Sequence, residues 1–269
     1  MKTLNTAWAF LKRDFLLATS YKSAFIMQLG GIFLGVPFIF FISQFLGGSG
    51  NKLLAAYNNN YFAFLLIGVA LTDYLTVSLA TFNTSIRENQ MMGTLEIIMM
   101  SPTAVTTLVL CSSLWGYLFT SVRFMLYLAV GLFFNLNLGN ANLGAALTIL
   151  LFAIISFASI GILIASITMI IKRGESLNVA FSGVSVLLGG VVFPTAALPH
   201  WLYQIGQLLP LTHALEGMRL AMLKGYSIQQ LWPELSALGL FALIFSPLGL
   251  LAFQTALRWT KREGTLSQY

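Results

Sequence analysis

The chain has 269 residues, of which 58% are apolar and only 8% are charged. Soluble domains carry roughly a quarter charged residues, so this composition all but excludes a water-soluble protein. It also excludes disorder, because disordered chains are poor in apolar residues and rich in charge. The net charge of +6 is spread over the ends of apolar runs. This distribution indicates contact with lipid headgroups rather than with nucleic acid.

Residues 1–22 form the first predicted element. Leu4, Trp8, Leu11 and Phe15 share one face of a helical wheel, and the charged residues lie roughly opposite. This pattern is typical of an amphipathic helix that lies in the inner membrane interface. A frayed cytoplasmic segment is the alternative.

Six apolar segments follow, and we predict that each is a transmembrane helix. Backbone groups in hydrocarbon must be hydrogen bonded within their own segment, which favours a helix. The strict alternation of a membrane β-barrel is not seen in these runs. We therefore predict an all-α, polytopic membrane protein that forms a single domain over residues 1–269. The expected spans are residues 24–46, 61–83, 104–134, 143–171, 177–193 and 235–257.

The basic residues predict the orientation of these spans. If the N-terminus is cytoplasmic, ten Lys and Arg residues lie inside, three lie outside, and Arg123 is embedded. The opposite orientation would violate the positive-inside rule. We therefore expect a multi-pass protein with both termini on the cytoplasmic side.

The connection over residues 86–102 is expected in the cytoplasm. Residues 94–100 are compatible with a short helix, which Gly93 precedes and Pro102 ends. An exposed apolar stripe on such a helix suits docking into a groove of another protein, or packing on the inner headgroups. The stripe consists of Leu95, Ile98 and Met99.

Residues 194–224 contain three prolines that cut an apolar stretch into pieces too short to span the membrane. We predict one short helix that has Pro199 in its first turn and runs to about Leu209, and a second that Thr212 caps. Two such half-helices fit a re-entrant hairpin or a lid on the outer side, or they float at the outer surface. Within the second helix, the spacing of Glu216 and Arg219 predicts a local ion pair.

Two opposite charges are expected inside the bilayer. Asp73 lies 12 residues after Tyr61, and Arg123 lies 12 residues before Asn135. At about 1.5 Å per residue, each is about 18 Å from the outer end of its span. Our hypothesis is an interhelical ion pair that orients the helices. The competing interpretation is that each residue faces a wet cavity separately.

Several segments together resemble the permeases of type-two ABC exporters, a family that includes drug-efflux and polysaccharide or lipo-oligosaccharide permeases. The resemblance covers essentially the whole chain. Its order and spacing are more specific than any one motif. The segments that carry it are Gly93-Thr-Leu-Glu96, Ser101-Pro102, Phe193-Pro194, Leu198-Pro199, Leu209-Pro210-Leu211-Thr212 and Arg219.

The resemblance implies six transmembrane helices per subunit, an interfacial N-terminal helix, a coupling helix and short outer helices after the fifth span. It also implies a second permease copy, in a homodimer, and an ATP-binding cassette subunit that binds ATP and Mg²⁺. The expected coupling residues are Arg87, Glu88, Gly93, Thr94, Leu95, Glu96, Ile98, Met99 and Pro102. The expected outer-gate residues are Phe193, Pro194, Pro199, Trp201 and Pro210.

The chain has no expected catalytic, cofactor or metal residues of its own. Its nearest approach to a phosphate-binding loop, residues 47–53, has the wrong spacing and ends in leucine. We therefore expect the energy to come from the separate ATP-binding subunit. The expected cargo is hydrophobic or amphiphilic, such as a drug or a lipid-linked molecule or glycoconjugate. The alternatives are an ion-coupled carrier, which would need more buried titratable groups, and a non-transporting membrane scaffold.

Overall fold

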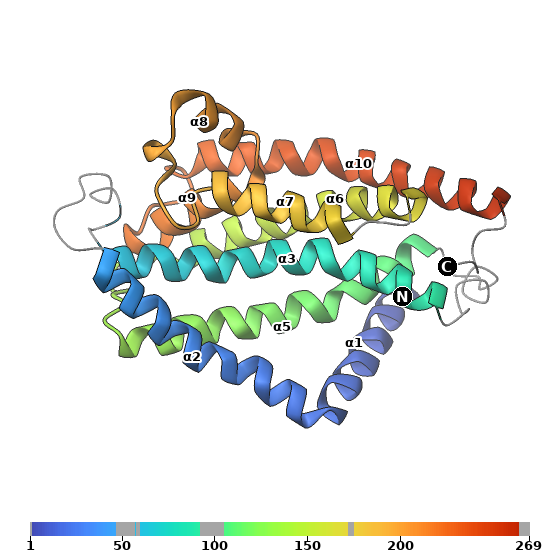
Figure 1. Ribbon diagram of the computed structural model, residues 1–269, viewed down its shortest axis with the longest axis horizontal. Coiled ribbons are helices and arrows are strands. Elements are labelled where there is room, and N and C mark those ends of the chain that lie inside the picture. The colour runs from blue at the N-terminus through green and yellow to red at the C-terminus, as the bar shows by residue number, and fades with distance from the viewer. Residues whose placement is uncertain (1, 47–56, 58–59, 92–104, 172–174, 264–269) are drawn as a thin grey trace.

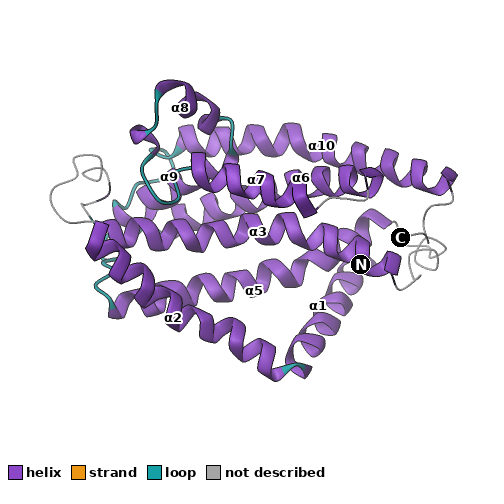
Figure 2. Ribbon diagram, in the orientation of Figure 1, coloured by secondary structure: helices purple, strands orange, loops and turns teal. Residues whose placement is uncertain are grey.

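The computed structural model describes residues 2–46, 57, 60–91, 105–171 and 175–263 (Figure 1). Every regular element in these ranges is helical (Figure 2). The prediction of an all-α protein is therefore confirmed for the described part of the chain. The elements are α1 (Lys2–Ser20), α2 (Lys22–Leu46), α3 (Tyr61–Met91), α5 (Val105–Phe133), α6 (Leu143–Ile171), α7 (Glu175–Leu188), η2 (Thr195–Ala197), α8 (His200–Gln207), α9 (Pro210–Leu223) and α10 (Trp232–Glu263).

Five helices in the described residues, α2, α3, α5, α6 and α10, are long and apolar enough to cross a membrane. The sixth expected span, 177–193, is different. It overlaps the 14-residue helix α7, which at about 1.5 Å per residue is shorter than a hydrocarbon core of about 30 Å. The chain leaves the helix at Gly189 and Gly190, and Gly190 has a φ of +82°. This left-handed conformation ends a helix and favours glycine.

The helices are arranged so that α3 runs through the centre of the bundle (Figure 1). It contacts α5, α6 and α9, while α10 packs along α6. The start of α1 and the end of α10 lie at one end of the bundle, and α8 and α9 lie at the other (Figure 1). Helix α7 runs in the direction from the first of these ends toward the second (Figure 1). We call the end with α8 and α9 the outer end, following the orientation predicted by the basic residues.

The core is built around α3, whose Phe64, Leu71 and Tyr74 are fully buried. Its closest neighbour is α6, where a Cβ atom at Gly161 would overlap the backbone carbonyl of Ser78. A glycine at this crossing lets the two backbones approach more closely than any larger residue would allow. Helices α3 and α6 therefore form a rigid pair against which the other elements are positioned.

Helix α1 leaves α2 at a steep angle and packs against α5 (Figure 1). The contact includes an edge-to-face pair of Phe15 and Trp115, with ring centroids 5.7 Å apart. The predicted helix is present between Lys2 and Ser20. Its position in the membrane interface stays a prediction.

Candidate functional site: the ion pair and the outer seal

Asp73 on α3 and Arg123 on α5 meet near the middle of their spans. Arg123 Nη2 lies 2.8 Å from Asp73 Oδ2, and the two side chains are 25% and 22% exposed. Equal depth on antiparallel helices, the basis of the sequence hypothesis, does bring the two side chains into contact. Asp73 Oδ2 and Arg123 Nε nevertheless lack a hydrogen bond of acceptable geometry. Both of these atoms are buried, whereas other parts of the two side chains are exposed.

Hydroxyl groups connect α3 and α5 on both sides of this pair. Tyr127 interacts with both charges. The hydroxyl of Tyr74 donates to Ser121 Oγ at 3.0 Å. One further turn along, the hydroxyl of Tyr117 donates to Ser78 Oγ at 2.9 Å. The interface between the two helices is thus polar at several levels, which matters because hydrocarbon offers no competing hydrogen-bond partners.

The outer end is closed around Arg219, a residue of α9 that is only 2% exposed. Its Nη1 donates to the carbonyl of Gly190 at 2.8 Å. Its Nη2 donates to the carbonyls of Phe64 and Val191, both at 3.1 Å. One guanidinium therefore joins α9, the start of α3 and the segment after α7. We call this arrangement the outer seal, defined by Arg219, Phe64, Gly190 and Val191.

The predicted local pair of Glu216 and Arg219 is wrong. Arg219 turns inward to backbone carbonyls, and Glu216 instead accepts a hydrogen bond from the hydroxyl of Tyr57. The carbonyls of Gly190 and Val191 lie in the irregular segment after α7, so they are free to accept from Arg219. Burial lowers the pKa of Arg219 to about 10, so the side chain stays protonated at neutral pH.

The expected outer-gate residues occupy different environments. Pro194 is buried and precedes η2, Pro199 precedes α8, and Pro210 is buried in the first turn of α9. Phe193 is half-buried, whereas Trp201 is 63% exposed on α8. The prolines thus define where each short element begins, which is the role that their fixed φ predicts.

Thr212 does not cap α9, contrary to prediction. Leu209 is at the N-cap position, and Pro210 takes the first helical position. The Thr212 hydroxyl is buried and donates to the carbonyl of Gly206 at 2.6 Å. It therefore fastens α9 to the end of α8. The predicted cap was misplaced because Pro210 lacks a backbone N–H and so begins a helix without needing a side-chain cap.

His213 joins three outer elements. Its Nδ1 lies 2.6 Å from Glu234 Oε2 on α10, and its Nε2 lies 3.0 Å from the carbonyl oxygen of Gln207 on α8. A carboxylate and a carbonyl oxygen both accept hydrogen bonds, so this geometry fits a protonated ring that donates from both nitrogens. Burial opposes this charge, but Glu234 outweighs it and raises the pKa of His213.

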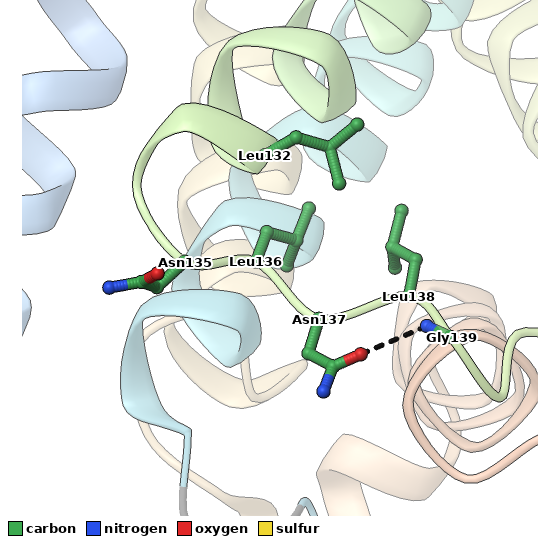
Figure 3. A pocket seen from close by; sticks show the side chains of 6 residues that line it. All are labelled: Leu132, Asn135, Leu136, Asn137, Leu138 and Gly139. Carbon is green, nitrogen blue, oxygen red and sulfur yellow. Dashed lines mark hydrogen bonds between the residues drawn. The ribbon is translucent and has the colours of Figure 1, made fainter.

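Three cavities lie at the outer end. One of about 350 Å³ is lined by Tyr57, Tyr203, His213, Glu216 and Glu234, among others. A second, of about 210 Å³, lies between Tyr57, Asn60 and Asn140. The largest, about 630 Å³, is an open hollow at the turn between α5 and α6, where Asn137 Oδ1 accepts from the backbone N–H of Gly139 at 3.0 Å (Figure 3). Polar side chains therefore line cavities at the outer end.

Comparison with known families gives the identification. The sequence model described as "ABC-2 family transporter protein" matches residues 49–251, which is most of the chain. The chain belongs to the ABC-2 transporter family. It is the membrane permease of an ABC transporter, and this family implies an ATP-binding cassette partner. A search of curated proteins finds no match to this permease.

The predicted coupling region of the permease cannot be compared with the structure. The backbone of Arg87 and Glu88 lies in the last turns of α3, but their side chains are outside the described residues. Gly93, Thr94, Leu95, Glu96, Ile98, Met99 and Pro102 also lie outside the described residues. The end of α3 from which this region continues lies at the same end of the permease bundle as the start of α1 (Figure 1).

Two features of the permease were missed from the sequence. The outer seal was missed because its acceptors are backbone carbonyls, which leave no mark in the residue pattern. The contact between His213 and Glu234 was missed because 21 positions separate the two residues, and nothing local indicates that α9 returns to the start of α10. The sequence does offer one indication of this contact. Histidines and acidic residues are rare in the chain, which has two and eight of them, so a pairing of the two types could have been considered.

Proposed function

We propose that this permease is the membrane half of an ATP-driven exporter for hydrophobic or amphiphilic cargo in the bacterial inner membrane. Two copies would form the pathway, and each would rest on an ATP-binding cassette subunit. The observation that carries the proposal is the asymmetry of α3. Its outer half, from Phe62 to Leu71, is buried on almost every side, while Thr76, Ala80 and Thr84 in its inner half are exposed. A pathway closed outside and open inside is one of the two states that alternating access requires.

The outer seal supplies the closure in this mechanism. Opening toward the outside requires α9 to move away from α3, which separates Arg219 from the carbonyls of Phe64, Gly190 and Val191. Because the guanidinium holds all three carbonyls, we expect this release to be concerted rather than gradual. A packed contact with two discrete arrangements suits a two-state gate.

The energy for this change would come from the partner. The ATP and Mg²⁺ are held by the cassette subunit, and its closure would push on residues 86–102. Helix α3 begins at the outer seal and continues toward this region, so one rigid element links the coupling region to the gate. The coupling helix is thus proposed to act on the gate through α3.

An ion-coupled carrier is a weaker proposal. Such a carrier needs several titratable groups in a relay across the membrane. In the middle of the described spans, the charged groups are Asp73 and Arg123, and they are already in contact with each other. A single pair does not provide successive sites for a proton.

The test is co-purification of the full chain with the cassette ATPase and measurement of coupled ATP hydrolysis. Replacing residues 91–102 with a Gly/Ser linker of equal length should abolish both. The control is Leu243→Ala, because Leu243 is 74% exposed on α10 and far along the chain from the coupling region. Unchanged complex formation and hydrolysis in the linker variant would overturn the coupling assignment. Transport by the reconstituted permease alone would overturn the proposed function.

A further inference from the structure

One face of α3 differs from the exposed surfaces of the other spans. Thr76, Ala80 and Thr84 are the exposed residues in the described span of α3, and they recur every fourth position. Residues at this spacing form one line along a helix. Half-buried Thr72 and Asp73 continue the line toward the outer seal. We call these five residues the α3 strip.

The chemistry of the strip is unsuited to lipid. The other spans expose large apolar side chains, such as Leu34 on α2, Met125 on α5 and Leu243 on α10. The strip presents hydroxyls, a methyl group and a carboxylate. A partly exposed charge near the bilayer centre costs several kcal/mol if it faces lipid, so such residues face water or protein.

The threonine side chains of the strip can still accept hydrogen bonds from a ligand. The hydroxyls of Thr72, Thr76 and Thr84 donate to backbone carbonyls of their own helix, at 2.8, 3.1 and 2.7 Å. Each oxygen keeps lone pairs that can accept from a ligand. At the outer end of the strip, Asp73 and Arg123 form a neutral ion pair whose side chains are 22% and 25% exposed.

The strip lies between two other helices. Arg123 brings α5 to one side, and on the other side Asn83 Nδ2 donates to Asn178 Oδ1 of α7 at 3.0 Å. Figure 1 shows α3 between α5 and α7. The line runs for 12 residues, or about 18 Å, from Thr84 to Thr72, beyond which α3 is buried up to the outer seal. It therefore leads from the inner end to a closed end beside the ion pair.

We propose that the α3 strip is a hydrated track for the polar group of the cargo, and that the Asp73–Arg123 pair is the site where this group stops beneath the outer seal. This deepens the proposed function and rests on it. The ligand class is an amphiphile with a neutral or zwitterionic polar group rich in hydrogen-bond donors. A cargo with a net charge would gain little binding energy from an ion pair that is neutral overall. A polar group with several hydrogen-bond donors would instead match the acceptor oxygens of the threonines.

The first experiment measures water at the strip. Single cysteines replace Thr76 and Ala80 in a Cys111→Ala background, and the complex with its ATPase is kept in inside-out vesicles. Leu79→Cys is the buried control on α3, and Leu243→Cys is the exposed control on an apolar face. The probe is a charged, membrane-impermeant methanethiosulfonate. It reacts with thiolate, which forms in water and not in hydrocarbon.

We expect the cysteines at 76 and 80 to react at least about tenfold faster than both controls, because only a hydrated thiol has an appreciable thiolate fraction. Rates equal to that of Leu243→Cys would overturn the track. So would disulfide cross-linking of Thr76→Cys between two copies in place of labelling, because a second subunit would then cover the strip. If the proposed function fails instead, the complex neither forms nor hydrolyses ATP, and this is measured separately on the same vesicles.

The second experiment tests the charge pair. At Thr76→Cys, the ratio of labelling rates for cationic and anionic methanethiosulfonates is measured with Asp73→Asn and with Arg123→Gln. Arg123→Gln should raise the ratio several-fold because Asp73 is left unbalanced, and Asp73→Asn should lower it by a similar factor. A ratio that neither variant changes would show that the pair does not face the track and would overturn its assignment as the stopping site.

Discussion

The guanidinium of Arg219 lies over the ring of Phe64, with its central carbon 3.4 Å from the ring centroid. The same side chain donates to the backbone carbonyl of Phe64. The cation–π contact and the hydrogen bond therefore attach α9 to a single residue in the first turn of α3. One turn further along, a Cβ atom at Gly68 would lie 2.9 Å from Arg219 Nη2, so only glycine leaves room for this arrangement.

Arg219→Lys tests the outer seal. An ammonium group lacks the planar fork of guanidinium and cannot reach all three carbonyls, so buried acceptors lose their partners. We expect a loss of about 2–4 kcal/mol in the free energy of unfolding, measured by denaturation in detergent. Arg258→Lys is the matched control, because Arg258 is exposed on α10 and should tolerate the change. Equal effects in the two variants would contradict the role of Arg219.

Gly161→Ala tests the crossing of α3 and α6. The new methyl group would overlap the carbonyl of Ser78, so the helices must separate or the carbonyl must move. Overpacking of this kind costs about 1–3 kcal/mol, seen as a lower melting temperature. Gly183→Ala is the control, because a Cβ atom there meets nothing within 4 Å. It should be neutral or stabilising, since alanine is the better helix former. A lower melting temperature for Gly183→Ala but not for Gly161→Ala would contradict the predicted packing.

The sequence predicted positions correctly where they depend only on the geometry of a straight helix. Asp73 and Arg123 could be brought together from residue counts, because a transmembrane helix has a fixed rise per residue and its depth is simply counted. The bounds of α5 and α6 follow their apolar runs for the same reason. The break after α7 was harder to predict. Gly189 and Gly190 lie within the apolar run that predicts the span 177–193, but the positive φ of Gly190 shows that the helix ends before it.

The sequence was uninformative where the answer lies in tertiary structure. Arg219 seemed to have a partner three residues away, yet its acceptors are carbonyls up to 155 positions distant in the chain. A desolvated guanidinium needs several acceptors, and the one carboxylate of Glu216, which accepts from Tyr57, does not supply them. The polar line on α3 was hidden for a related reason. Threonines in a span are unremarkable until the structure shows that they share its only exposed face within the described part of that span.

Exchange of charges tests the contact of Asp73 with Arg123. Asp73→Arg or Arg123→Asp alone places two like charges side by side and should cost about 1–3 kcal/mol, allowing for the partial exposure of both groups. The double variant restores an opposite pair and should recover part of that loss in the same denaturation assay. If the double variant is no more stable than either single variant, the two charges act separately.

The pH dependence of stability tests the contact of His213 with Glu234. The charged groups that act on the ring are Glu234 and Glu216, and the neutral phenol of Tyr57 lines the same cavity. Since the folded pKa of His213 is raised, its contribution to stability is complete below the unfolded value of about 6.5 and is lost as pH rises through the folded value. The melting temperature should therefore fall above neutral pH more steeply for the wild type than for His213→Gln. His200→Gln, on the exposed surface of α8, should keep the wild-type profile. Parallel profiles for the wild type and His213→Gln would show that the imidazolium does not hold α9 to α10.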